Sequence, residues 1–173
     1  MKKISLIAVA LAAAGISSMA SAADGTVNFT GTIRDTACTV DTASANQTVN
    51  LGTVAATSFG SSGATASSSR FTINLTGCPA AVTSANIRFD GPLSSGNSDL
   101  LALSSDQTAT NVGVGIYQQD STTLIPVGRA SAPVTLSTTG TNALNFIAKY
   151  VSTAATVGAG SANAVATFTV AYN

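Results

Sequence analysis

Residues 26–33 read Thr-Val-Asn-Phe-Thr-Gly-Thr-Ile, so polar residues alternate with apolar or small ones. Successive side chains of a strand point to opposite faces, and the residues that would share one face are Val27, Phe29, Gly31 and Ile33. The segment lies near the start of the chain, ahead of the first cysteine. A terminal strand with one apolar face can add to an open sheet edge of a neighbouring molecule. The pattern therefore predicts the building block of a polymer.

The residues before this segment have the pattern of a secretory signal peptide. Lys2 and Lys3 precede an apolar run over residues 4–16, and a small-residue cleavage site follows at 20–22. The alternative, a membrane anchor, is disfavoured because the run is shorter than the roughly 18 to 20 residues that span a bilayer. We therefore expect residues 1–22 to be removed, leaving 173 − 22 = 151 residues with no membrane span. We expect an extension over 23–36 and one domain over 37–173.

Charged residues are sparse, at 8% of the chain against about a quarter in ordinary domains. Without Lys2 and Lys3, five basic residues face seven aspartates, for a net charge of 5 − 7 = −2. The basic residues are scattered singly, whereas nucleic-acid binding needs them clustered. The chain has no His and no Glu, so no plausible general base accompanies the scattered aspartates. The composition therefore predicts neither an enzyme nor a nucleic-acid-binding protein, and no cofactor or metal site.

The two cysteines, Cys38 and Cys78, are predicted to form one disulfide, because the exported chain meets an oxidising compartment and has no third thiol. The closed loop spans 78 − 38 = 40 positions, which is worth about 4 kcal/mol on the chain-entropy model. A catalytic or metal-binding thiol pair is the alternative. It lacks support, since there is no Cys-x-x-Cys pattern.

Period-two alternation recurs through the remaining chain and predicts an antiparallel all-β sandwich. The expected strands cover residues 71–75, 85–89, 112–116, 144–151 and 164–172, and residues 58–69 are expected to be a mobile surface loop. Within 112–116, Gly113 and Gly115 predict a bulge or a close approach. The last strand would carry Ala166, Phe168, Val170 and Tyr172 on one face. Its far side is expected to be an open sheet edge, the alternative being a normal last strand whose neighbours come from within the domain.

Several motifs, in this order and spacing, resemble the subunits of chaperone-usher fimbriae, in particular the major-subunit type of type 1 fimbriae. The resemblance covers essentially the whole chain. It rests on the signal peptide and on the following segments: Gly-Thr-Val-Asn-Phe-Thr-Gly-Thr-Ile at 25–33, Ala-Cys-Thr-Val at 37–40, Leu-Thr-Gly-Cys-Pro at 75–79, Val-Gly-Val-Gly-Ile-Tyr at 112–117, Phe-Ile-Ala-Lys-Tyr at 146–150 and Ala-Thr-Phe-Thr-Val-Ala-Tyr-Asn at 166–173.

The resemblance implies an incomplete immunoglobulin-like sandwich, the pilin fold, which lacks its last strand and leaves a groove beside the C-terminal strand. In this family a periplasmic chaperone fills the groove first, reading a penultimate aromatic residue, alternating apolar residues and a glycine fourteen positions from the end. These positions are Gly160, Ala166, Phe168, Val170 and Tyr172.

At the outer-membrane usher, the family then exchanges the chaperone strand for the next subunit's extension, building a surface fibre used in cell adhesion. Residues 27–33 match the family's donor strand, with Gly31 at a shallow pocket that excludes a side chain. The alternative is a minor adaptor or tip subunit of the same fimbria, or a small carbohydrate-binding adhesin. The resemblance also implies that a tip adhesin carries an additional receptor domain, for which 151 residues leave no room.

Overall fold

The computed structural model describes residues 25–31, 33 and 37–173, and the chain divides into two units, residues 1–33 and 34–173. The predicted signal peptide and the predicted boundary at 36/37 lie outside the described residues. Residues 25–31 and 33 form neither helix nor strand. A strand is defined by hydrogen bonds to a neighbouring strand, so the strand expected over 26–33, which would pair with another molecule, stays a prediction for the assembled subunits.

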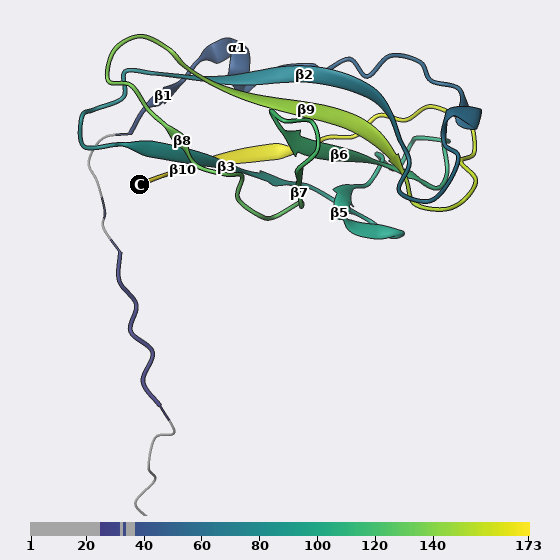
Figure 1. The fold of residues 1–173 in the computed structure, drawn as a ribbon, viewed down its shortest axis with the longest axis horizontal. Coiled ribbons are helices and arrows are strands. Elements are labelled where there is room, and N and C mark those ends of the chain that lie inside the picture. The colour runs from purple at the N-terminus through teal and green to yellow at the C-terminus, as the bar shows by residue number, and fades with distance from the viewer. Residues whose placement is uncertain (1–24, 32, 34–36) are drawn as a thin grey trace, which may run out of the picture. The chain divides into compact units, whose positions relative to one another are not determined.

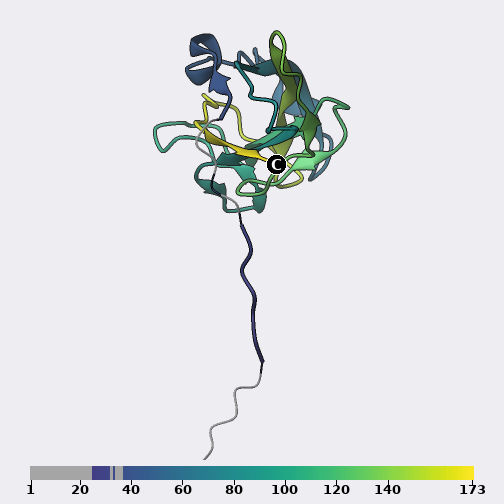
Figure 2. The same cartoon turned by 90° about the vertical axis from the view of Figure 1, so that its left-hand side faces the viewer.

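The second unit is an all-β sandwich of two sheets (Figures 1 and 2). The larger sheet has the order β1-β2-β9-β6-β5-β4, with β7 also pairing with β6, and the smaller has the order β10-β3-β8. The elements are β1 (Thr39–Val40), α1 (Thr42–Ala45), a 3-10 helix (Ala56–Ser58), β2 (Thr65–Thr76), β3 (Ser84–Asp90), β4 (Leu93–Ser94), β5 (Asn97–Leu101), β6 (Val112–Gln118), β7 (Leu124–Ile125), β8 (Val134–Thr135), β9 (Asn142–Ser152) and β10 (Thr167–Tyr172). All the strand pairings are antiparallel.

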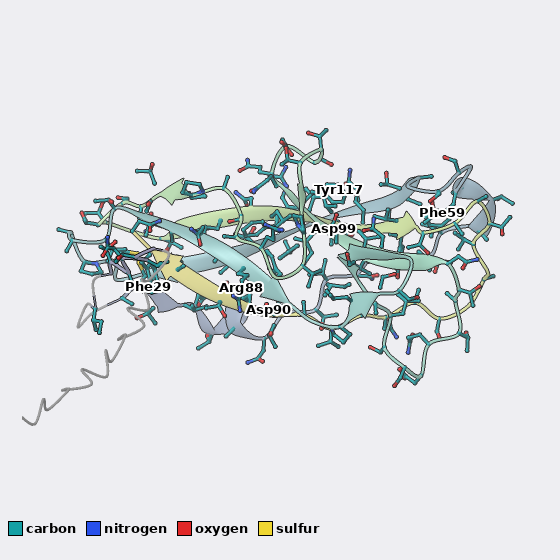
Figure 3. The ribbon with its side chains drawn as sticks, turned by 90° about the horizontal axis from the view of Figure 1, so that it is seen from below. Phe29, Phe59, Arg88, Asp90, Asp99 and Tyr117 are labelled. Atoms are coloured by element: carbon teal, nitrogen blue, oxygen red, sulfur yellow. A yellow bond between two sulfur atoms is a disulfide. The ribbon has the colours of Figure 1, made fainter. Side chains whose placement is uncertain are left out.

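Three phenylalanines join the two sheets in the core. Phe89 of β3 packs edge-on against Phe146 of β9 and Phe71 of β2, with ring centroids 5.1 and 5.9 Å apart. Such aromatic pairs contribute about 0.5–1.5 kcal/mol each beyond the area they bury. On the opposite, solvent-facing side of β3, Arg88 Nε lies 2.9 Å from Asp90 Oδ2 in an exposed ion pair (Figure 3). The alternation of β3 therefore separates a buried face from a charged outer face.

The glycines of β6 make room for apolar side chains on its outer face. The pairing of β6 with β9 runs without a register shift, which does not support a bulge. A Cβ atom at Gly113 would lie 2.9 Å from the backbone oxygen of Leu101, so the predicted close approach of backbone is confirmed. A Cβ atom at Gly115 would lie 2.9 Å from Cε2 of Tyr117 and 3.0 Å from Cγ2 of Val151. Tyr117 and Val151 form a second buried cluster with Leu100 and Ile147, separate from the main core.

The predicted loop over residues 58–69 is wrong in its second half, because β2 begins at Thr65. Only the stretch before Thr65 lies outside strands, and Thr65, Ala66 and Ser69 already pair with β9. Residues 65–69, Thr-Ala-Ser-Ser-Ser, are small and mostly polar, and they lack the alternation that marks residues 71–75.

In the described part of the chain, no helix has the length and apolar character needed to cross a membrane.

Candidate site: a groove beside the C-terminal strand

An open cavity of about 610 Å³ lies between the approach to β10 and a segment that begins in the last turn of α1. One wall consists of residues 162–166 and Phe168, and the opposite wall consists of residues 44–52 without Asn46. None of the described residues that line the cavity is charged. The floor is made of core side chains, namely Phe71, Ile73, Phe89, Leu101, Val114, Ile116, Ala148 and Tyr150. The groove is therefore suited to an uncharged, partly apolar segment.

The first wall continues into β10, which pairs with β3 on one side only. Phe168, Val170 and Tyr172 are half-buried and pack against the core, whereas Thr167 and Thr169 point outward. The shared face predicted for the last strand is thus observed for these three residues. Ala166 lies one residue before β10, where it is exposed and lines the groove. Because no second strand pairs with β10 among the described residues, the predicted open edge is confirmed.

The register shows which backbone groups of β10 face the open edge. Asn173 and Ser84 exchange two hydrogen bonds, with N···O distances of 2.9 and 3.2 Å. In an antiparallel ladder, hydrogen-bonded pairs alternate with non-bonded pairs, so the residue pairs 171/86, 169/88 and 167/90 bond across to β3. The N–H and C=O groups of Phe168, Val170 and Tyr172 therefore point away from β3. Six backbone groups are available to an added strand.

The part of the opposite wall that follows α1, residues 47–52, was not predicted from the sequence. It forms no strand, although Val49 and Leu51 are half-buried and alternate with exposed Thr48 and Asn50. The alternation is a strand-like signal, but it covers too few residues to stand out in a chain rich in Thr and Ser. This segment supplies the second side of the groove.

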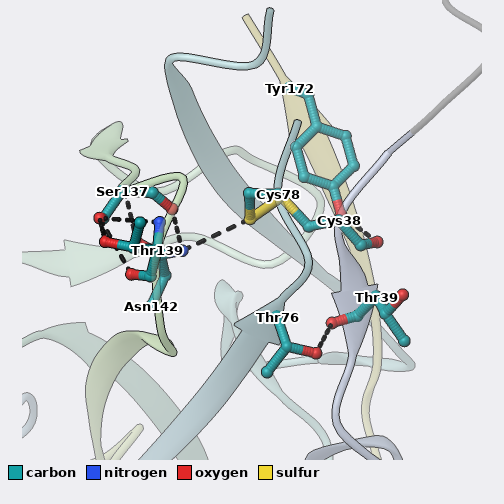
Figure 4. Close-up of a disulfide and its surroundings, with 8 residues drawn as sticks. All are labelled: Cys38, Thr39, Thr76, Cys78, Ser137, Thr139, Asn142 and Tyr172. Atoms are coloured by element: carbon teal, nitrogen blue, oxygen red, sulfur yellow. Dashed lines mark hydrogen bonds between the residues drawn. A yellow bond between two sulfur atoms is a disulfide. The ribbon is translucent and has the colours of Figure 1, made fainter. Parts of the chain in front are cut away.

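The predicted disulfide between Cys38 and Cys78 is present and fastens the start of the body to the turn that follows β2 (Figure 4). β1 follows Cys38 directly and pairs with β2, Thr39 opposite Thr76. The Tyr172 hydroxyl donates to the carbonyl oxygen of Cys38 at 3.2 Å. Burial raises the pKa of Tyr172, so the phenol stays protonated as the donor that this bond needs. The penultimate residue thereby ties the end of β10 to the disulfide.

Gly160 lies outside β10, in a stretch that packs closely against residues 108–109. A Cβ atom there would collide with the backbone nitrogen of Ala109 and with Oγ1 of Thr108. Two residues further on, the carbonyl oxygen of Ala162 accepts a hydrogen bond from the Tyr150 hydroxyl at 3.0 Å. The absence of a side chain at Gly160 thus allows the tight packing that positions the first wall of the groove.

The apolar residues predicted to form a donor strand are exposed, with exposed fractions of 74% for Val27, 92% for Phe29 and 99% for Ile33. A Cβ atom at Gly31 would have no neighbour within 4 Å. These residues belong to the first unit, and the groove belongs to the second. The fold and the groove together define a class of protein, a β-sandwich subunit with a vacant edge.

The comparisons with known proteins agree with this class. A model of the family described as "Fimbrial protein" matches residues 27–173, so the chain belongs to the fimbrial protein family. It is 41% identical to the type-1 fimbrial protein, C chain, of Escherichia coli over 179 residues, covering 99% of this chain and 98% of that one.

Solved structures point the same way. A type I fimbria protein and antigen of Burkholderia pseudomallei is 36% identical, with a TM-score of 0.62 over 86% of this chain and 97% of that one. A chaperone-usher pilus structure is 25% identical, with a TM-score of 0.66 over 87% and 96%. The chain is thus a structural subunit of a type 1-like, chaperone-usher fimbria, with the incomplete immunoglobulin-like fold expected for one, and the adaptor and adhesin alternatives are not favoured.

Proposed function

We propose that copies of this subunit join by donor-strand exchange, residues 27–33 of one copy filling the groove of the next. The open edge of β10 carries this proposal, because it pairs an apolar floor with six free backbone groups. Seven residues from 27 to 33 match the seven from 166 to 172 in length. A chain that has both an extension and a groove can polymerise head to tail with itself, as the repeating unit of a shaft.

The energy available for this exchange is large. Burying Val27, Phe29 and Ile33 at about 1.5–3 kcal/mol each gives about 5–9 kcal/mol, an upper estimate because free chains already hide some surface. Backbone hydrogen bonds along β10 add about 0.5–1.5 kcal/mol each. The sum is comparable with the whole stability of a typical domain, about 5–15 kcal/mol. A filled groove therefore stabilises the subunit strongly.

Before assembly, the same edge needs a temporary occupant. A periplasmic chaperone that adds a strand to β10 would cover Phe168, Val170 and Tyr172, and an outer-membrane usher would then catalyse the exchange. The exposed apolar residues of the extension and the open edge both support this route, since unprotected edges lead to aggregation. The expected path runs through the periplasm, after removal of residues 1–22, to the cell surface.

Gly31 gives the test of this proposal. Gly31→Leu is expected to block fibre formation, because leucine would clash in the shallow pocket that the family resemblance implies at this position, while the complex with the chaperone stays intact. Thr30→Leu is the matched control, since residue 30 is also exposed and lies on the opposite face of the inserted strand. Fibres are counted by electron microscopy of cells that express chain, chaperone and usher. Normal fibres from Gly31→Leu, or from a chain without residues 23–33, would refute the proposal.

A further inference from the structure

The groove wall over residues 47–51 is attached to β2 through side chains. Ser69 Oγ donates to the carbonyl oxygen of Asn50 at 2.5 Å, and Ser67 Oγ donates to that of Leu51 at 2.7 Å. Near the other end of the wall, Gln47 Nε2 donates to the carbonyl oxygen of Thr72 at 3.3 Å. Within the part of the chain that the structure describes, no backbone ladder joins this wall to β2. Among the described residues, the backbone N–H groups of residues 47–51 donate no hydrogen bond, so the wall lies beside β2 and is held there by side chains.

An irregularity in β2 aims the two serines at the wall. Between Ala66 and Ser69, β2 advances three residues while β9 advances two, from Tyr150 to Ala148. The extra residue is a β-bulge, a feature that redirects side chains. Ser67 has a φ of 62°, in the left-handed region that non-glycine residues avoid. Such backbone strain persists only where surrounding contacts hold it, and it is common at functional sites.

We propose that Ser67 and Ser69 are positioning residues for strand binding, because their hydroxyls set the distance between the wall and β10. Held at β2 by these hydroxyls, Asn50 and Leu51 line the groove across from residues 162–166 and Phe168. The inference rests on the proposed function, since it names residues that keep the same groove open. The bulge thus fixes the second side of the groove through side chains, whereas a backbone ladder with β3 fixes β10 on the first side.

Fibres of the mature chain provide the test. Ser67→Ala/Ser69→Ala is expected to release subunits about tenfold faster at a fixed guanidinium concentration, because two hydrogen bonds are lost. Amide hydrogen exchange at residues 48–51 of the fibre is expected to rise by about the same factor, while the amides of β9 that pair with β6 keep their rates. Ser68→Ala is the matched control, since Ser68 lies between the two serines and is exposed. Ser69→Thr retains the hydroxyl and is expected to behave like the parent.

The outcomes separate this inference from the proposed function. Equal release rates for the double variant and Ser68→Ala would overturn the inference alone. Faster exchange spread evenly over the body would also overturn it, because that result indicates general destabilisation. A parent chain that forms no fibres overturns the proposed function and this inference with it. If the double variant yields no fibres, Ser69→Ala alone is tested by subunit release and by amide exchange at residues 48–51. Its subunits are expected to be released about threefold faster than those of the parent, and a release rate equal to that of Ser68→Ala would overturn the inference.

Discussion

Replacement of Gly160 by alanine is expected to destabilise the body by forcing two packed segments apart. The added Cβ would collide with the backbone nitrogen of Ala109 and would lie 2.5 Å from the carbonyl carbon of Thr108. Ordinary van der Waals contact begins at 3.4 Å, so the segments must separate by about 3.4 − 2.5 = 0.9 Å. Backbone atoms on the opposing side cannot rotate away as a flexible side chain would.

The hydrogen bonds across this contact set the magnitude. Ala109 N donates to the carbonyl oxygen of Ser161 at 3.0 Å, and Gly158 N donates to that of Thr110 at 3.0 Å. An added 0.9 Å would stretch both to about 3.9 Å, beyond hydrogen-bonding range. Two lost bonds, together with overpacking, correspond to about 2–4 kcal/mol. In a domain of this size, the expected drop in Tm is roughly 5–15 °C.

Thermal unfolding of purified Gly160→Ala, followed by circular dichroism, measures this drop. Gly60→Ala is the control, because a Cβ there meets nothing within 4 Å and the position needs no left-handed φ. The control is expected to unfold within about 1 °C of the parent. If Gly160→Ala matched the control, the packing argument would be refuted, and the glycine at this position would need another explanation.

Two further predictions concern the turn after β6 and the outer face of β6. Hydrogen bonds from the Thr123 hydroxyl, the Thr123 N–H and the Thr122 N–H lower the pKa of Asp120 from 3.8 to about 2. Because the folded pKa is lower than the unfolded one, the carboxylate stabilises the turn above about pH 4, and this contribution disappears as the pH falls through 2. Thr123→Val is expected to raise the pKa of Asp120 in a carbon-13 NMR titration. An unchanged pKa would contradict this prediction. Gly115→Ala places a Cβ 2.9 Å from the Tyr117 ring, so we expect the free energy of unfolding in denaturant to fall by about 1–3 kcal/mol. Gly25→Ala is the control and is expected to leave this free energy unchanged, because a Cβ there meets nothing within 4 Å. An unchanged free energy of unfolding for Gly115→Ala would contradict the prediction.

The strands that alternate strictly were predictable from the sequence. Residues 85–89 and 112–116 fall within β3 and β6, because one buried face imposes a period of two that the side chains display directly. The disulfide was also predictable, since a chain with only two cysteines allows one intramolecular pairing. The face that β10 packs against the core was predictable from the alternation of residues 166–172, and the structure shows that β10 pairs on one side only.

The second wall of the groove could not be predicted in the same way. Alternation marks strands that bury one face, whereas residues 47–51 are mostly exposed and are held by serine hydroxyls from β2. The bulge that aims those hydroxyls lies in a run of serines that has no apolar periodicity. The hydrogen bonds from the two serine side chains join residues that are 16 and 19 positions apart, so they leave no local signal in the sequence.

The two sides of the groove therefore differ in how firmly they are held, and this difference bears on assembly. β10 is fixed by a six-residue register with β3 and by the Tyr172–Cys38 hydrogen bond at its end. The opposite wall depends on a few side-chain hydrogen bonds worth about 1 kcal/mol each. A strand arriving at β10 thus meets a rigid template on one side and an adjustable one on the other. Because the lining is uncharged, the fit must be decided by the size and spacing of apolar side chains, which is the property that residues 27, 29, 31 and 33 display.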